Sequence, residues 1–152
     1  MSSPIVKQPG DPVMQFSVFL PSKLGTLMRL VKLLEGAHVQ VLGMSLHDST
    51  DATVVRVVVS DPDIVEQLFY ERGIPFSSLE MIAVELADGA AGLGRCLSAL
   101  LEGEVNLLFS YPLMNRPGLG TVIVMHVEDT PFGINVLQRN GYKVLFQGDL
   151  TR

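Results

Sequence analysis

The residues of this chain that are able to take part in catalysis are few, and their spacing fits none of the common catalytic or metal-binding patterns. Three histidines, His38, His47 and His126, lack both the i, i+4 pairing and the neighbouring thiolates typical of a metal site. The only cysteine, Cys96, lies in an apolar helical pattern and offers neither a disulfide framework nor a thiolate metal site. No Ser–His–Asp set and no pair of carboxylates on adjacent elements can be placed by spacing. The sequence therefore predicts no enzymatic activity, no cofactor and no metal.

Two segments instead have the features of a binding site for a small anionic group. Residues 21–25 and residues 88–92 each follow an expected strand and open an expected helix. The N-terminus of a helix exposes unpaired N–H groups and the positive end of the helix dipole, which suit a carboxylate. Glycines such as Gly25, Gly89 and Gly92 let the backbone approach a small ligand closely.

Two polar side chains on expected strands have open roles. Asn106 opens the expected strand at residues 105–111, and its amide can both donate and accept hydrogen bonds toward a zwitterion. An asparagine at a strand start can equally well only face solvent. Arg56 lies on an otherwise apolar strand, either as an edge-facing charge or as one partner of an interface ion pair.

Three other motifs are better explained as local structure. Gly89-x-x-Gly92-x-Gly94 follows a strand, but its spacing differs from that of a dinucleotide-binding loop and no parallel sheet follows it. Residues 115–118 fall where a hairpin loop is required. Asp48 and Asp51 are typical of a loop rather than of a cation site.

The elements that must position these residues occur twice. Strand-like runs at residues 53–59 and 121–127 lie 68 positions apart, and each leads into an aspartate, a proline and an apolar helix face. The expected strands cover residues 16–20, 39–47, 53–60, 76–79, 82–86, 105–111, 121–127 and 142–146, with a helix after the first and third strand of each copy. Right-handed crossovers then place both helices on one face of each antiparallel sheet. The predicted fold class is α+β, with two ferredoxin-like βαββαβ modules.

The two modules follow each other without a linker, because residues 79–81 run directly into residues 82–84. We expect a flexible N-terminal tail at residues 1–14, a first domain at residues 15–80 and a second at residues 81–150. Modules joined in this way are not expected to swing freely.

Composition narrows the class of partner. Hydrophobic residues make up 47% and charged residues 18% of the chain, which predicts burial of surface between modules or in a homodimer or larger homo-oligomer. A net charge of −5 without a Lys/Arg cluster argues against nucleic acid. No 18 apolar residues run together, so no membrane span is expected. The single cysteine fits a reducing, cytoplasmic setting.

The span from residue 15 to residue 150 resembles the short stand-alone proteins made of two ACT domains in tandem, a family of small regulatory domains. The family's turn commonly reads Asp/Asn-x-Pro-Gly-x-Leu, and residues 22–27 keep its glycine and leucine, whereas residues 88–93 keep its aspartate and leucine. The family's second strand often reads apolar-Asn-apolar. Asn106 matches this asparagine in the second copy, whereas the first copy has Gln40, whose side chain is one methylene longer. These departures favour a site centred on the strand of the second copy.

The resemblance implies a sensor that binds a free amino acid at an interface between ACT domains and regulates a partner protein, of unknown identity, in trans. Its ligand lies between the turn after the first strand of one domain and the second strand of a neighbour. The residues implied are Ser22, Lys23, Leu24, Gly25, Gln40, Val41, Asp88, Gly89, Ala90, Ala91, Gly92, Asn106 and Leu107.

Two alternatives remain. Because the turns depart from the family pattern, the chain can be an oligomerisation or protein-interaction module with degenerate ligand sites. The RNA-recognition motif shares the same element order, but it needs exposed aromatic residues on its central strands, and residues 53–59 contain none.

Overall fold

The computed structural model describes residues 10–21, 23–48, 52–114 and 120–151. Its strands are β1 Val13–Leu20, β2 Val41–Asp48, β3 Thr53–Val59, β4 Phe76–Leu86, β5 Leu107–Pro112, β6 Thr121–Val127 and β7 Lys143–Leu145. Its helices are α1 Lys23–Gly36, α2 Pro62–Arg72, the short 3₁₀ helix η1 Gly89–Gly92, α3 Leu93–Glu102, α4 Thr130–Arg139 and α5 Gln147–Leu150. Within these described ranges, no helix is long and apolar enough to cross a membrane.

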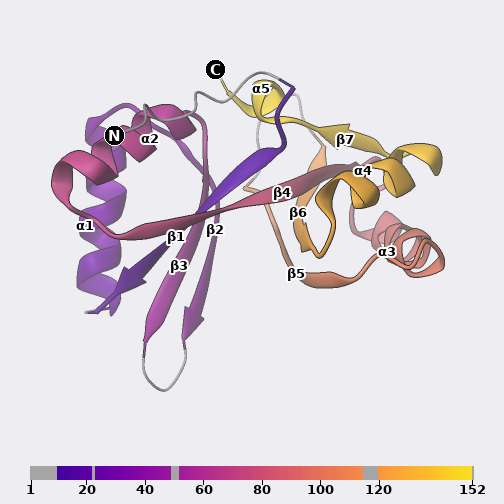
Figure 1. The fold of residues 1–152 in the computed structure, drawn as a ribbon, viewed down its shortest axis with the longest axis horizontal. Helices are drawn as coiled ribbons and strands as arrows, with labels where there is room; N and C mark the ends of the chain where they lie inside the picture. Colours follow the sequence, from indigo (N-terminus) through magenta and orange to yellow (C-terminus); the bar gives the residue numbers. More distant parts are fainter. Residues whose placement is uncertain (1–9, 22, 49–51, 115–119, 152) are drawn as a thin grey trace.

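Two βαββαβ units share one long strand, β4 (Figure 1). Residues 76–81 of β4 pair antiparallel with β1, which gives the strand order β2-β3-β1-β4 in the part that we call unit 1. Residues 82–86 pair with β6, and residues 83–85 also with β7, which gives the order β5-β6-β4-β7 in unit 2. The predicted α+β fold of two ferredoxin-like units is confirmed, and the two strands expected at residues 76–79 and 82–86 are one continuous strand.

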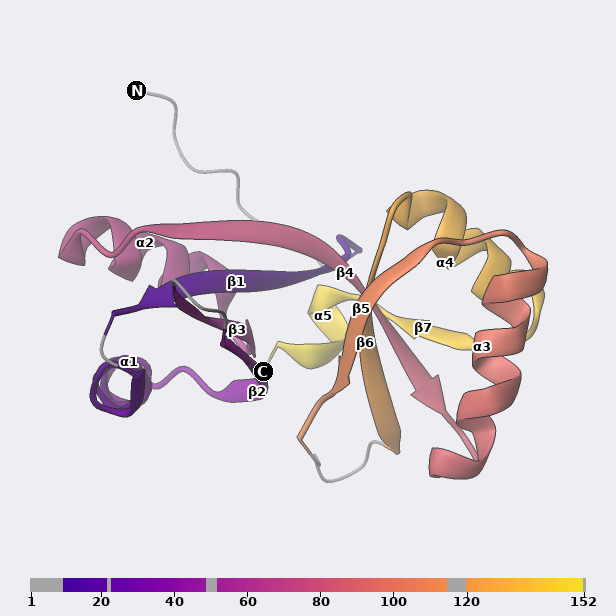
Figure 2. The same ribbon diagram turned by 90° about the horizontal axis from the view of Figure 1, so that it is seen from below.

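Each sheet carries its helices on one face, α1 and α2 on unit 1 and α3 and α4 on unit 2 (Figure 2). The strands alternate, so every second side chain points toward the helices. In unit 1 this face buries Phe16 and Leu34, and the ring of Phe69 meets that of Phe16 edge-on at 5.8 Å. In unit 2 it buries Met125 and Leu137. Burial of side chains of this size contributes roughly 1.5–3 kcal/mol each.

Local signals fix the ends of the helices. Gly73 ends α2 in the left-handed conformation, with φ of 66°. Asp129 caps α4 by accepting a hydrogen bond from the backbone N–H of Phe132 at 3.1 Å. Asp61, at the corresponding position before α2, makes no such cap, because its carboxylate accepts the Ser60 hydroxyl at 2.6 Å instead.

The helix-free faces of the two sheets pack against each other. This third core includes Val58, Met81 and Val124. Tyr111 from β5 is buried within it and donates from Oη to Gln15 Oε1 at 2.7 Å. Apolar and polar contacts together fix the two units relative to each other.

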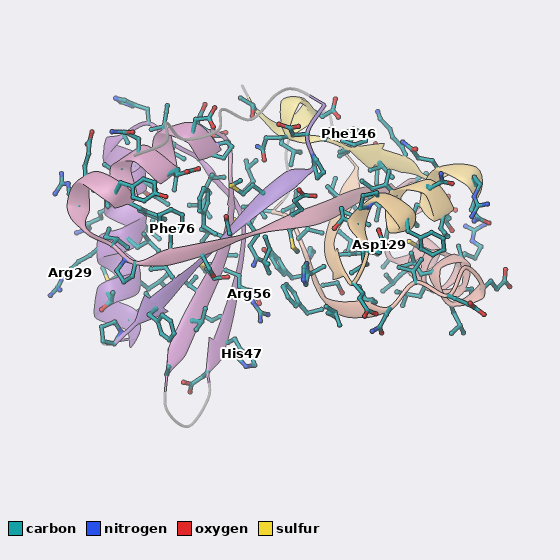
Figure 3. The ribbon with its side chains drawn as sticks, viewed as in Figure 1. Arg29, His47, Arg56, Phe76, Asp129 and Phe146 are labelled. Atoms are coloured by element: carbon teal, nitrogen blue, oxygen red, sulfur yellow. The ribbon has the colours of Figure 1, made fainter. Side chains whose placement is uncertain are left out.

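Arg56 has neither of the two roles that the sequence left open. Its guanidinium carbon lies 3.8 Å from the centre of the Phe109 ring, so that a cation of unit 1 stacks on an aromatic ring of unit 2. Figure 3 shows Arg56 on the face of unit 1 that is turned toward unit 2. The sequence alone could not predict this contact because it depends on how the units pack.

The C-terminal helix α5, which the sequence did not predict, ties the end of the chain to unit 1. Buried Gln147 accepts the backbone N–H of Met14 at 3.1 Å and donates to the carbonyl of Val59 at 3.2 Å. Its own backbone N–H donates to the carbonyl of Asp11 at 2.9 Å.

Several bounds differ from those expected. β1 begins at Val13, inside the segment expected to be a tail, because Val13 pairs with Met81 and is fully buried. β5 begins only at Leu107, so Asn106 precedes the strand. Leu97 belongs to the apolar helical pattern around Cys96, but it is 38% exposed. The hairpin loop expected at residues 115–118 lies outside the described residues.

Candidate functional site

The turn of unit 1 is only partly described. Ser22 lies outside the described residues, and α1 begins directly at Lys23. Leu24 and Gly25 follow in the first turn of the helix and are both exposed.

The strand residues expected to complete that site are held by the fold. Gln40 donates its backbone N–H to Ser60 Oγ at 2.9 Å, and its carbonyl accepts from Ser60 N at 2.9 Å. Val41 opens β2 and packs against the core of unit 1. The backbone of Gln40 is therefore occupied, and only its exposed side chain remains for a ligand.

The turn of unit 2 leads through η1 into α3, and the backbone N–H of Leu93 at the start of α3 donates to the carbonyl of Ala90. Gly89 adopts φ of 60°, a conformation that glycine accepts without strain, and opens η1, which runs directly into α3. No side chain caps the N-terminus of α3, where Gly92 stands at the cap position. Asp88 forms an exposed ion pair with Arg95. Ala90 and Ala91 between them are exposed.

Asn106 lies on the wall of a groove of about 500 Å³ at the other end of α3. Its side chain donates from Nδ2 to Glu128 Oε2 at 3.2 Å, and its carbonyl accepts the backbone N–H of Glu128 at 3.1 Å. The groove is lined by Glu80, Glu104, Val105, Asn106, Glu128, Asp129, Thr130, Pro131 and Phe132. Leu107, the next residue of β5, packs into the core of unit 2 instead.

The groove is acidic. Four of its lining residues carry carboxylates and none is a lysine or arginine, which favours a cation or an ammonium group over an anion. Asp129, labelled at the start of α4 in Figure 3, accepts a hydrogen bond from the backbone N–H of Phe132. This N–H at the start of α4 is therefore not available to an anion. Phe132, 44% exposed, adds an apolar wall.

The turn of unit 2 and the groove are not brought together within one chain. They lie at opposite ends of α3, whose 10 residues span about 15 Å. In unit 1 the 14 residues of α1 separate Lys23 and Gly25 from Gln40 in the same way. A ligand the size of an amino acid therefore cannot touch both groups of one unit.

An exposed apolar strip runs between the two groups of unit 2. It consists of Leu93, Leu97 and Leu101 on α3, spaced four residues apart, and Leu108 on the edge strand β5 is a further exposed leucine of the same unit. Leu101 is 78% and Leu108 is 53% exposed. We call these four leucines the α3–β5 surface. Exposed apolar side chains that gather along one side of a helix are typical of an interaction site.

The buried titratable groups lie away from the groove. Burial raises the pKa of the Cys96 thiol, which sits in the core of unit 2. Burial also raises the pKa of the Tyr111 phenol, and the charge of Arg56 lowers it only in part. Both side chains are protonated at neutral pH and serve packing.

A family model described as an ACT domain pair matches residues 12–150. This chain belongs to the ACT domain pair family. The match covers both units, and the resemblance seen in the sequence is confirmed. No curated protein matches the chain significantly.

Solved structures share the fold of this ACT domain pair. Protein BT0572 from Bacteroides thetaiotaomicron is 19% identical, with 95% of this chain and 99% of that chain covered and a TM-score of 0.85. The regulatory subunit of aspartate kinase from Thermus thermophilus, in its ligand-free form, is 10% identical, with 91% and 98% covered and a TM-score of 0.54. A structure of aspartokinase alpha and beta subunits is 15% identical, with 83% and 90% covered and a TM-score of 0.54. At these identities the likeness concerns the fold.

Several features of the site escaped the sequence. Glu128 and Phe132 line the groove but belong to a strand end and a helix start, and only the fold places them beside Asn106. The only sequence signal for this acidic groove was the pair of adjacent acids, Glu128 and Asp129, after a strand. The exposure of Leu101 had a signal too, because Leu101 does not fall on the face of α3 that buries Cys96 and Leu100.

Proposed function

We propose that this ACT domain pair is a non-enzymatic sensor that binds a free amino acid between two copies of the chain and regulates another protein in trans. The two ACT domains would span residues 15–80 and 81–150, and the setting would be the cytoplasm. One observation carries the binding proposal: the turn of unit 2 and the groove beside Asn106 differ in electrostatic character and lie at opposite ends of α3.

The two groups suit opposite ends of a zwitterion. At the turn, the backbone amides of η1, which no side chain caps, and the positive end of the α3 dipole would favour the carboxylate of the ligand. At the groove, Asn106 and the surrounding carboxylates favour its ammonium group. Gly89 and Ala91 leave room for the ligand backbone at the turn.

Antiparallel pairing of two copies across the α3–β5 surface would bring these groups together. In such a pair the start of one α3 lies beside the end of the other, so the turn of one copy faces Asn106 of the other. The two-fold symmetry gives two equivalent sites per dimer. Leu97 and Leu101 would be buried in the contact, which accounts for their exposure in the single chain.

Regulation follows if the ligand stabilises one arrangement of the copies over another. A ligand shifts such an equilibrium only by its differential affinity for the two arrangements. Because the amino acid bridges two chains, it favours the paired state, and the paired state is what a partner protein would recognise.

The α3–β5 surface also supports a second candidate. Four exposed leucines can serve an interaction module that oligomerises or covers a partner without any ligand. Under this alternative the turn of unit 2, which lacks the family's proline, is only a connection between β4 and η1.

A thermal-shift panel of the common amino acids separates the two candidates. A ligand at 100 times its dissociation constant adds ~2.7 kcal/mol to the stability, which raises the midpoint of unfolding by several degrees. We expect one amino acid or a small group to give this shift and Asn106→Ala to abolish it. Gln138→Ala, on the exposed side of α4, serves as the matched amide control and should keep the shift. If no amino acid at millimolar concentration raises the midpoint of unfolding, the interaction module is favoured.

A further inference from the structure

Arg56 of unit 1 reaches across the boundary between the units and stacks on an aromatic ring of unit 2. Its guanidinium carbon lies 3.8 Å from the centre of the Phe109 ring. Both side chains are half-buried, so the contact is partly shielded from water. The attraction between a cation and an aromatic face strengthens when the two groups lose contact with water. Figure 3 shows that Arg56 lies on the side of unit 1 that faces unit 2.

A bulge in β5 turns Phe109 toward unit 1. Leu107 packs into the core beneath the helices of unit 2, and in a regular strand Phe109, two residues later, would point to the same face. The register shift between Leu107 and Phe109 instead packs Phe109 against the core between the two sheets. Bulges redirect side chains in this way and are frequent beside functional sites. The extra residue, Leu108, thus brings the ring under Arg56.

His126 connects this stack to the acidic groove. It pairs with Phe109 across β5 and β6, and the two ring centres are 5.3 Å apart. Its Nδ1 lies 3.3 Å from the carbonyl oxygen of Glu80, and because a carbonyl only accepts, Nδ1 is the donor. Glu80 lines the groove beside Asn106, close to the point where β4 changes its pairing from β1 to β6. A side chain of the stack therefore holds the backbone of a groove residue.

The neighbours of His126 and Phe109 along the chain also belong to the groove. Glu128, two residues after His126, accepts Asn106 Nδ2 at 3.2 Å and donates its backbone N–H to the Asn106 carbonyl at 3.1 Å. Asn106 itself precedes Phe109 by three residues. The stack and the groove are thus built on the same segments of β4, β5 and β6, so a displacement of the rings moves the walls of the groove.

We propose that Arg56 is a positioning residue for the groove of unit 2, on which it acts through Phe109 and His126. While the guanidinium covers the ring, the two rings stay stacked and His126 holds the backbone of Glu80, so the groove keeps the shape that accepts an ammonium group. When unit 1 moves away from unit 2, the cation leaves the ring and this support is lost. The consequence for affinity rests on the proposed function, whereas the effect on the groove itself does not depend on a ligand.

Nuclear magnetic resonance of the ligand-free protein tests the effect on the groove. The side-chain amide signal of Asn106 is identified by its loss in Asn106→Ala, and that of Asn140, at the far end of α4, is the reference in the same spectrum. Arg56→Met removes the charge, keeps an unbranched side chain and should displace the signal of Asn106 but not that of Asn140. Arg56→Lys keeps a cation over the ring and should displace it less. An unmoved Asn106 signal in Arg56→Met, or equal displacement by both variants, would overturn the proposal.

Calorimetric titration with the amino acid found in the thermal panel measures the consequence for binding. Arg56→Met should raise the dissociation constant about tenfold, and Arg56→Lys should raise it less. Gln147→Ala, which weakens the contact between the units at α5 without touching the stack, is the control and should keep the wild-type affinity. An unchanged dissociation constant in Arg56→Met would overturn the positioning role. If no amino acid binds the wild type, the proposed function fails, and the signal of Asn106 still decides the role of Arg56.

Discussion

The strand–helix junctions of the two units occupy equivalent places and differ in chemistry. In each unit the start of the second strand meets the end of the third strand and the start of the second helix. In unit 1 this place holds Ser60, which is fully buried and binds the backbone of Gln40. In unit 2 it holds Glu128, which is exposed, binds the side chain of Asn106 and lines the groove.

The difference shows that the same junction can serve packing in one copy of a duplicated unit and remain exposed in the other. A buried serine satisfies the backbone at low cost, and Gln147 of α5 covers the neighbouring carbonyl of Val59. The junction of unit 1 is thereby part of the contact that holds the chain together. The junction of unit 2 keeps its polar side chains at the surface, where a ligand can reach them.

Exchanging the two residues should have very unequal effects. Ser60→Glu places a carboxylate where no water reaches it and should lower the free energy of unfolding by about 3 kcal/mol or more. Glu128→Ser changes an exposed position and should stay within about 0.5 kcal/mol. Urea unfolding followed by circular dichroism measures both. Equal losses would show that the two junctions are alike.

Removing the α5 contact should weaken unit 1 by a smaller amount. Gln147→Ala leaves the buried N–H of Met14 and the carbonyl of Val59 without their partner, at a cost of about 2 kcal/mol. Gln138→Ala, an amide exposed on α4, is the control and should change little. A loss below 0.5 kcal/mol for Gln147→Ala would mean that α5 does not help to close the junction.

Tyr111→Phe should cost less than Gln147→Ala at neutral pH, about 1 kcal/mol for the lost bond to Gln15. The effect changes with pH because the folded-state pKa of Tyr111 lies above the unfolded value of 10.0. Stability from the protonated phenol is complete below pH 10 and falls as the pH rises above it. The wild type should therefore lose more stability than Tyr111→Phe between pH 10 and pH 11. Parallel losses would exclude Tyr111 as the source.

The sequence predicted the architecture because each unit repeats the same local signals. These signals act within a few residues, and the structure forms the elements that they predict. Examples are the valine-rich runs that begin at Thr53 and Thr121, the proline Pro62 after Asp61, and Gly73 at the end of a helix. The continuity of β4 followed from the absence of any turn signal before Ile82.

The site was predictable only in part, because its key relations are long-range. Asn106 and the turn at Gly89 were identified as binding residues, which remains a prediction. That they lie at opposite ends of α3 follows from the fold, and that Glu128 joins Asn106 depends on pairing between β5 and β6. The stacking of Arg56 on Phe109 likewise depends on contact between units.

Binding between copies is tested most directly by calorimetric titration of two complementary variants. Asn106→Ala removes the groove amide, and Ala91→Asp places a negative charge at the exposed turn. With the amino acid found in the thermal panel, each variant alone should bind nothing. In an equimolar mixture, half of the dimers contain one of each variant and regain one intact site, so binding should return with about a quarter of the wild-type stoichiometry. A mixture that shows no measurable binding, or a single variant that binds as well as the wild type, would contradict a site shared between two chains.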